Sequence, residues 1–522
     1  MKNWQDVARK LMPDADTDYI VGMHNFPWKR FVFRVFLFAL IVRLLIAGSY
    51  IHSFDTEWNI MWGVQLAQLS REQLFGFYKA YSYVSSLDYP PLYLYPLHIV
   101  GSLILKTDIG GYPPLRMLVL KFFPCLLDSL NCVVLYRLGS KRSQLIGFSG
   151  AALWAINPAT IINCAFWGQT DCVLMLAAAL LFLSLTERRI VASGVLFALM
   201  CSTKLQGLYL TPIVGMEILD ICFDGINVKK FKLSSLNRTN IMKFVWFVLS
   251  VLLTFTVIYL PFMVGSLFSL GNEAQSGWEK FFRPLTVYRE GLKKYPYVTL
   301  NADNLYMLLN LNGKKDNLSF FHGLSYELMG KLCLIVLMLS VVVIYLLGRR
   351  CSHWLTAYFF INGIFMLTCR QHERYQIMVL ILLAGAFMEL ADRRMLTLLS
   401  LHILVISVNQ FRILASVKEN SDWWGYYHTP MRSMKQMLES DMAAVKENGV
   451  AWLEYNHVIG RVNAAVNVCL LLAATVFVLR YVWDRRPLQP FLRRMKELLV
   501  DYRRRRETAD EWRGETELGN EE

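Results

Sequence analysis

Two sets of ionisable side chains lie at the ends of apolar segments, where charged groups are costly and usually have a role. The carboxylates of this kind are Asp55, Asp88 and Asp171. The cationic or titratable partners are Lys204, His372 and Arg374. A carboxylate can take a proton from an attacking hydroxyl group, and an arginine beside a histidine suits phosphate. Together they indicate an enzyme that acts on a phosphorylated, lipid-linked substrate.

Each candidate also has a structural interpretation. Asp55 could cap a helix, and Asp88 could be the N-cap of a helix beginning at the Pro90-Pro91 pair, which is compatible with a functional role. Lys204, in Lys204-Leu205-Gln206, could direct its ammonium group to the membrane interface. The turn Trp167-Gly168-Gln169-Thr170-Asp171 has more hydrogen-bonding groups than a connecting turn requires. We therefore include Trp167, Gln169 and Gln206 among the substrate-binding candidates.

A further polar segment runs from Tyr295 to Tyr306 and mixes aromatic, amide and carboxyl side chains. Aromatic rings can stack on a sugar ring while amides bind its hydroxyl groups. Tyr297, Asn301 and Asn304 are the candidates here, with Tyr89 from the Asp88 motif. The alternative is an ordinary loop in which Thr299 or Asn301 caps a helix.

The composition indicates the environment of these residues. Of 522 residues, 55% are hydrophobic and 18% are charged, against about 25% charged in soluble domains. The net charge is +14, but the basic residues flank apolar segments, which argues against a nucleic-acid surface. Most of the ten cysteines lie in apolar segments without paired spacing, so neither a disulfide framework nor a zinc site is predicted. The chain is predicted to be an all-α polytopic membrane protein.

Apolar segments predict about twelve transmembrane helices. They are 31–51, 115–138, 145–165, 170–186, 190–204, 205–222, 242–264, 328–348, 354–369, 375–391, 395–411 and 461–483. Lys/Arg clusters then lie on the cytoplasmic side, with both termini, if 90–106 is an external helix on or in the outer leaflet. Lys121 and Asp128, seven residues apart in the second span, could form a charge pair without a chemical role. We expect a multi-pass protein of the cell membrane.

Four regions are expected. They are a cytoplasmic segment 1–28, a catalytic membrane region 29–392 with an external loop 52–114, C-terminal helices 393–483 with an external loop 412–460, and a basic cytoplasmic tail 484–522. The tail is expected to contact anionic lipid rather than nucleic acid.

Eight motifs between residues 30 and 390 occur in the order found in one known class of enzymes. They are Asp55, Asp88-Tyr89-Pro90-Pro91-Leu92, Asp128, Asn157-Pro158, Trp167-Gly168-Gln169-Thr170-Asp171, Lys204-Leu205-Gln206, Tyr295-Pro296-Tyr297 with Asn301-Ala302-Asp303-Asn304-Leu305, and His372-Glu373-Arg374-Tyr375. The chain thus resembles GT-C fold glycosyltransferases, in particular bacterial proteins related to the second glycosylphosphatidylinositol mannosyltransferase, and the dolichyl-phosphate-glucose glucosyltransferases. It departs at Asp303, where those proteins typically carry Phe or an equivalent.

The resemblance implies a GT-C fold with external juxtamembrane helices and an inverting hexosyltransferase. A mannose or glucose would pass from a polyprenyl phosphate to an acceptor hydroxyl on a lipid-linked or cell-envelope glycan. Asp55 matches the catalytic base, no metal-binding residues are assigned, and no cofactor is identified. The alternative from the residues alone is a transporter or flippase of an anionic or lipid-linked substrate, although the inverted repeats typical of transporters are not visible.

Overall fold

The computed structural model describes residues 27–48, 53–72, 80–84, 87–223, 237–263, 277–321, 323–347, 352–417 and 457–484. Most of the predicted N-terminal segment, most of the external loop 412–460 and nearly all of the basic tail lie outside these residues. Within them the chain is almost entirely helical, with four short strands. The predicted all-α class is confirmed in this part of the chain.

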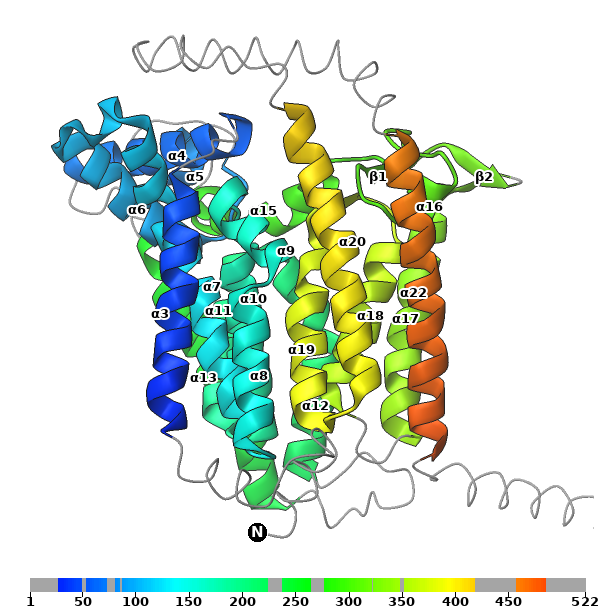
Figure 1. Ribbon diagram of the computed structural model, residues 1–522. Helices are drawn as coiled ribbons and strands as arrows, with labels where there is room; N and C mark the ends of the chain where they lie inside the picture. Colours follow the sequence, from blue (N-terminus) through cyan, green and yellow to red (C-terminus); the bar gives the residue numbers. More distant parts are fainter. Residues whose placement is uncertain are drawn as a thin grey trace, which may run out of the picture.

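A bundle of roughly parallel helices forms the body of the structure (Figure 1). Its first half consists of α3 (Trp28–Ala47), α7 (Pro113–Gly139), α8 (Gln144–Ala155), α9 (Pro158–Ile161), the π-helical η3 (Ile162–Trp167), α10 (Asp171–Thr186), α11 (Ile190–Thr203), the 3₁₀ helix η4 (Leu205–Leu210), α12 (Thr211–Phe223) and α13 (Arg238–Met263). The second half consists of α17 (Tyr326–Leu347), α18 (His353–Leu367), the 3₁₀ helix η6 (Tyr375–Ile377), α19 (Met378–Leu390), α20 (Arg393–Val417) and α22 (His457–Asp484). Each of the twelve predicted segments coincides with a helix or a helix pair of this bundle.

Six described helices are long and apolar enough to cross a membrane, or seven if the bent pair α8 and α9–η3 is one span. Four further apolar helices, α10, α11, α18 and α19, are shorter, and α3 carries Lys29, Arg30, Arg34 and Arg43. The chain is therefore a multi-pass membrane protein, while the count of twelve spans and the orientation of the termini stay predictions.

The outer surface of the bundle has the apolar character that lipid requires. On α13, Trp246, Leu253 and Val257 are more than half exposed, and Val336 on α17 is equally so. Exposed apolar surface on this scale would be unstable in water and is stable against hydrocarbon. The buried interior is continuous through both halves and includes Trp154, Phe182 and Trp354.

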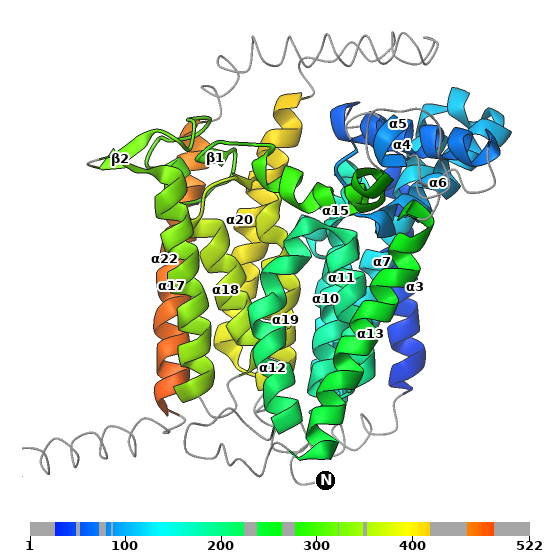
Figure 2. The same ribbon diagram turned by 180° about the vertical axis from the view of Figure 1, so that it is seen from behind.

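One end of the bundle, which the sequence assigns to the external side, carries the remaining elements (Figures 1 and 2). They are α4 (Ser53–Glu72), α5 (Ala80–Tyr83), α6 (Pro91–Lys106), the 3₁₀ helix η2 (Asp108–Gly111), α15 (Gly277–Lys293), β1 (Thr299–Leu300), α16 (Leu305–Leu308), β2 (Ser319–Phe321), β3 (Leu324–Ser325) and β4 (Gln371–His372). The helix expected over 90–106 is present as α6. It packs closely on α4, and the contact requires glycine: a Cβ atom added to Gly101 would lie 1.9 Å from the carbonyl oxygen of Gly63.

Two pairs of short strands complete this end. Strands β2 and β3 form an antiparallel hairpin, whereas β1 and β4 are parallel. In the parallel pair Thr299 lies opposite Gln371 and Leu300 opposite His372. This pairing joins the 295–306 segment to the His372 motif, which is more than 65 residues away in the chain.

The prediction that Lys121 and Asp128 could pair with each other is wrong. Asp128 pairs with Arg43 of α3 at 2.7 Å, and both side chains are fully buried. Lys121 donates to the carbonyl oxygen of Phe166 at 2.8 Å. Spacing within one helix could not reveal these partners, because they come from neighbouring helices.

Candidate functional site

The centre of the candidate site is the carboxylate of Asp55, in the first turn of α4. Its Oδ2 accepts hydrogen bonds from Trp167 Nε1 at 2.8 Å and Gln169 Nε2 at 2.6 Å. Trp167 is the last residue of η3, and Gln169 lies in the turn that follows, where Gly168 adopts a left-handed conformation with φ of 79°. The side chain of Asp55 is 21% exposed, so the carboxylate is oriented by two donors and still accessible from outside.

Arg374 lies on the other side of Asp55. Its Nη1 is 4.0 Å from Asp55 Oδ2 and 2.9 Å from Glu373 Oε1, and the guanidinium group lies 5.6 Å from the centre of the Trp167 ring. Among the described residues Arg374 Nε has no hydrogen-bond partner. Burial raises the pKa of Glu373 above its usual value, and the charge of Arg374 offsets only part of this increase. Arg374 thus presents a cation beside Asp55 with one N–H group available to a ligand.

His372 is held next to Arg374 by the pairing of β4 with β1. Its ring contacts Tyr295 at 4.6 Å between centroids and Tyr375 at 5.0 Å. Burial, reinforced by the charge of Arg374, lowers the pKa of His372 to about 3. Its Nε2 has no hydrogen-bond partner within the described part of the chain. His372 is therefore neutral near pH 7 and can donate to or accept from a ligand, without supplying a second positive charge.

Lys204 supplies a second cation from the junction of α11 and η4. Its Nζ lies 2.5 Å from Asp171 Oδ1, and Asp171 Oδ2 also accepts from Asn163 at 3.3 Å. The ammonium group lies 6.0 Å from the Tyr89 ring and 5.7 Å from the Tyr375 ring. Asp171 is thus neutralised, which distinguishes it from Asp55 as a candidate base. Lys204 is fixed rather than directed into the interface.

Two more predicted residues adjoin this pair. The hydroxyl of Tyr89 accepts a hydrogen bond from Thr170 at 3.3 Å, which connects the Asp88 motif to the Trp167–Asp171 turn. Gln206 is buried, and its Oε1 has no hydrogen-bond partner in the residues that the structure describes. Both side chains are placed where they can contribute to a binding site.

Asp88 is paired with a residue that the sequence analysis did not select. Lys294 Nζ lies 2.5 Å from Asp88 Oδ2, and the ammonium group lies 5.6 Å from the Tyr295 ring. Although burial lowers the pKa of Lys294, Asp88 raises it further, so this lysine is charged. Lys294 follows the end of α15, and its pair with Asp88 connects two external helices beside His372. The one signal in the sequence that could have pointed to Lys294 is its position directly before the Tyr295 motif.

Three predicted residues belong to a neighbouring polar loop rather than to the Asp55 cluster. Tyr297 packs on Lys315, with the ammonium nitrogen 4.1 Å from the ring centre. Asn301 has φ of 55°, and its amide Oδ1 accepts from Asn312. Asn304 is buried and caps α16 by accepting from the N–H groups of Tyr306 and Met307. The helix cap in this loop is Asn304, not Thr299 or Asn301.

Asp303, where the chain departs from the resemblance, has a clear structural role. Its Oδ1 lies 2.6 Å from Arg412 Nη2, and its Oδ2 accepts from Asn463 Nδ2 at 2.7 Å. Asn467 Nδ2 donates to the backbone carbonyl oxygen of Asp303 at 2.9 Å. The C-terminal helices α20 and α22 therefore hold the loop that carries Asn301 and pairs with His372.

The described residues contain no group of three or more His, Cys, Asp or Glu side chains that could hold a metal ion. A site built from Asp55, Arg374, His372 and Lys204 can orient a hydroxyl group and an anion directly.

The sequence is similar over residues 78–290 to the family described as GPI transamidase subunit PIG-U. This range includes Asp88, Trp167, Asp171 and Lys204, and excludes Asp55 and Arg374. Among curated proteins none matches the chain. The similarity therefore relates part of the membrane region to a membrane protein family and does not extend to the whole candidate site.

Proposed function

We propose that the chain is an inverting glycosyltransferase that moves a hexose, mannose or glucose, from a polyprenyl phosphate to an acceptor hydroxyl at the external face. The observation that supports this most strongly is the position of the Asp55 carboxylate 4.0 Å from the Arg374 guanidinium, at the predicted external end of the bundle. A base and an anion-binding group lie side by side, as direct displacement at an anomeric carbon requires.

In this proposal Asp55 takes the proton of the acceptor hydroxyl as its oxygen forms a bond to the anomeric carbon. The bond from that carbon to the phosphate oxygen breaks, and its electron pair leaves with the phosphate. The leaving group is then a phosphate monoester dianion that needs cations rather than a general acid. A single displacement inverts the configuration at the anomeric carbon.

The groups around Arg374 suit that leaving phosphate. Arg374 Nε and His372 Nε2 are buried without partners among the described residues, and buried unpaired polar groups are expensive unless a ligand satisfies them. Neutral His372 can donate to a phosphate oxygen from one tautomer. Lys204 and Lys294, each paired with a carboxylate, provide further positive charge nearby.

In this proposal the acceptor binds beside Asp55, next to the turn that carries Trp167 and Gln169 and that contacts Tyr89 through Thr170. A glycan or glycolipid hydroxyl can bind to the carboxylate and amide groups while its ring packs on the aromatic side chains.

A second candidate is a non-catalytic subunit of a membrane complex. Similarity to the family described as a transamidase subunit favours it, because that similarity covers residues 78–290. Such a subunit would bind a glycolipid in the same cluster without transferring sugar.

The two candidates differ in a transfer assay on the purified full-length chain in nanodiscs. Polyprenyl-phosphate mannose and polyprenyl-phosphate glucose, each tritiated in the sugar, are supplied with glycolipids extracted from the source membrane. The enzyme is expected to move label to glycolipid from one donor, with none moved from a nucleotide sugar. Tight glycolipid binding without release of label from either donor would instead support the subunit, and uptake of intact donor into proteoliposomes would support a transporter.

A further inference from the structure

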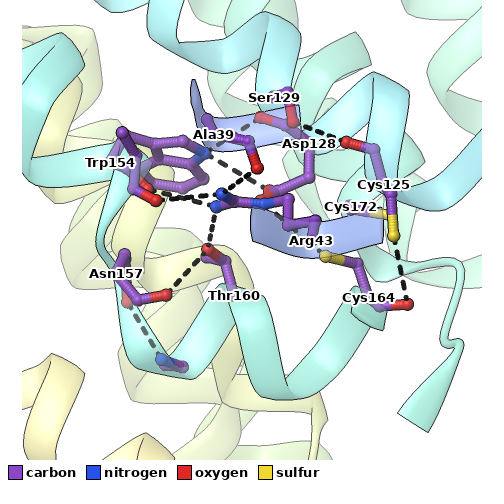
Figure 3. A network of polar contacts seen from close by, with 12 residues as sticks. Ala39, Arg43, Cys125, Asp128, Ser129, Trp154, Asn157, Thr160, Cys164 and Cys172 are labelled. Carbon is purple, nitrogen blue, oxygen red and sulfur yellow. Dashed lines mark hydrogen bonds and ion pairs between the residues drawn. The ribbon is translucent and has the colours of Figure 1, made fainter. Parts of the chain in front are cut away.

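Arg43 of α3 and Asp128 of α7 form a fully buried ion pair inside the helix bundle (Figure 3). Arg43 Nε donates to Asp128 Oδ2 at 2.8 Å, and Trp154 Nε1 lies 3.3 Å from Asp128 Oδ1. Burying two charges costs several kcal/mol per ion, by order of magnitude, before their attraction is counted. An apolar pair would hold α3 and α7 together as well, so helix packing alone does not require these residues.

Arg43 Nη1 donates to the carbonyl oxygen of Ala39 in its own helix at 3.1 Å, and its other bonds show what the charge achieves. Its guanidinium group donates to the carbonyl oxygens of Ala155 at 2.9 Å and Trp154 at 3.2 Å, and to Thr160 Oγ1 at 3.0 Å (Figure 3). These acceptors lie on both sides of the break between α8 and α9, where the helices bend by 44°.

The break leaves these carbonyl groups without their helical donors. Trp154 would normally accept from residue 158, but Pro158 has no N–H group, and the Trp154 carbonyl oxygen accepts from the N–H group of Asn157 at 3.2 Å instead. Ala155 would accept from Ala159, whose N–H group instead donates to Asn157 Oδ1 at 3.1 Å. Arg43 supplies the donor that Ala155 has lost and a second donor for Trp154, and Asp128 neutralises its charge.

The chain after the break leads directly to Trp167 and Gln169, which donate hydrogen bonds to Asp55. Helix α9 continues into η3, and η3 ends at Trp167, followed by Gly168 and Gln169. The far end of this segment is held by Lys121, which donates to the Phe166 carbonyl oxygen at 2.8 Å. The methylene groups of Lys121 also lie against Gly168, where an added Cβ atom would be 3.1 Å from them. The α9–η3 segment is thus fixed at one end by Arg43 and at the other by Lys121.

We infer that the Arg43–Asp128 pair is a positioning device for the reaction centre. By fixing the broken helix, it sets where Trp167 Nε1 and Gln169 Nε2 meet Asp55 Oδ2, and so the orientation of the proposed base. The role of Arg43 in turnover rests on the proposed function. Its control of the Trp167 position does not.

The test uses Arg43→Lys, because an ammonium group keeps the charge opposite Asp128 but cannot reach all the acceptors on both sides of the break. Full-length protein is labelled with 5-fluorotryptophan, and the Trp167 resonance is assigned by its loss in Trp167→Phe. Asp55→Asn calibrates how this resonance responds when its acceptor changes. Ser184→Ala is the matched control, since it removes a buried hydrogen bond to Ser193 at the opposite end of α10.

Arg43→Lys is expected to shift or broaden the Trp167 resonance, as Asp55→Asn does, while Ser184→Ala leaves it unchanged. Turnover should fall about 10-fold or more with little change in donor KM, since a misplaced base affects the chemical step. Gln169→Ala introduced into Arg43→Lys should then lower turnover by a smaller factor than Gln169→Ala does in the wild type, because both changes disturb the same contact with Asp55.

An unchanged Trp167 resonance in folded Arg43→Lys would overturn the inference, as would normal turnover or strictly additive losses with Gln169→Ala. If Arg43→Lys does not fold, Thr160→Val removes a single bond of Arg43 and should give the same changes at smaller size; an unaltered spectrum in that folded variant would also overturn it. A wild type that transfers no sugar would refute the proposed function, while the fluorine spectrum would still test the positioning.

Discussion

Replacing Asp55 by Asn separates a base from a structural acceptor. The asparagine side chain retains the shape of the aspartate, and its carbonyl oxygen can still accept from Trp167 and Gln169, the two donors now at 2.8 and 2.6 Å from Asp55 Oδ2. The amide cannot take a proton at neutral pH. The substitution therefore removes the proposed chemistry while it keeps much of the hydrogen-bond geometry.

The expected loss in turnover is about 10²–10⁴-fold, the usual contribution of a positioned general base. It corresponds to about 3–5 kcal/mol in the activation barrier. The effect on folding should be smaller, because two charge-assisted hydrogen bonds become neutral ones at a cost of about 1 kcal/mol each. The Arg374 contact is 4.0 Å long and partly exposed, so it adds little.

The assay measures label transfer at saturating donor, alongside thermal unfolding of the same preparations. Asp392→Asn is the matched control, because Asp392 pairs with Arg394 between α19 and α20, at the other end of α19 from Arg374. That variant should keep normal turnover. Turnover in Asp55→Asn within a few-fold of the wild type would refute Asp55 as the base, and Asp88 and Asp171, each paired with a lysine at 2.5 Å, would become the next candidates.

Arg374→Ala should strongly lower the use of donor, and Arg374→Lys should recover only part of it, because an ammonium group lacks the planar arrangement of N–H groups that binds phosphate. Equal activity of the wild type and both variants in donor titrations would make Arg374 an interfacial anchor. His372 has a pKa of about 3 in the fold and about 6.5 when unfolded, so the unfolded chain binds the extra proton between these values. Stability should therefore fall as pH drops below about 6.5, by up to about 1.4 kcal/mol per pH unit, and thermal unfolding of His372→Gln should show a weaker decline. A cysteine replacing Lys141 should be labelled only from the cytoplasmic side and one replacing Lys106 only from the external side, against the wild type as background; the opposite pattern would invert the topology.

Much of the fold could be predicted because membrane helices are long apolar segments bounded by charge. Each predicted span coincides with a helix or a helix pair, and the Pro90-Pro91 pair does open a helix, α6. The gathering of Asp55, the Trp167 turn, Lys204 and Arg374 also follows from the sequence. Each lies where a predicted span reaches the same side, so the count of crossings brings them to one end of the bundle.

The partners of these residues could not be predicted, because they depend on how helices rotate and pack. Asp128 pairs with Arg43, which is 85 residues distant, and helical spacing pointed instead to Lys121. The bend before Pro158 was not predicted, because residues 145–165 are one continuous apolar segment in the sequence. Asn304 is the cap of a short helix because its backbone is extended at that position, and composition cannot distinguish this from sugar binding.

Lys294 illustrates a different limit. In the sequence it stands among charged residues after an amphipathic segment, and only the fold brings it to 2.5 Å from Asp88. Likewise, the resemblance covers roughly residues 30–390, yet Arg412, Asn463 and Asn467 beyond it hold the loop around Asp303.

The central claim is that this site transfers a sugar from a polyprenyl phosphate by a single displacement. The most direct measurement follows donor labelled with ¹³C at the anomeric carbon by NMR, with wild-type protein in nanodiscs and the acceptor glycolipid. We expect the donor signal to be replaced by that of a glycoside whose one-bond C–H coupling shows the inverted configuration. A donor signal that persists unchanged, or a product that retains the donor configuration, would contradict the account.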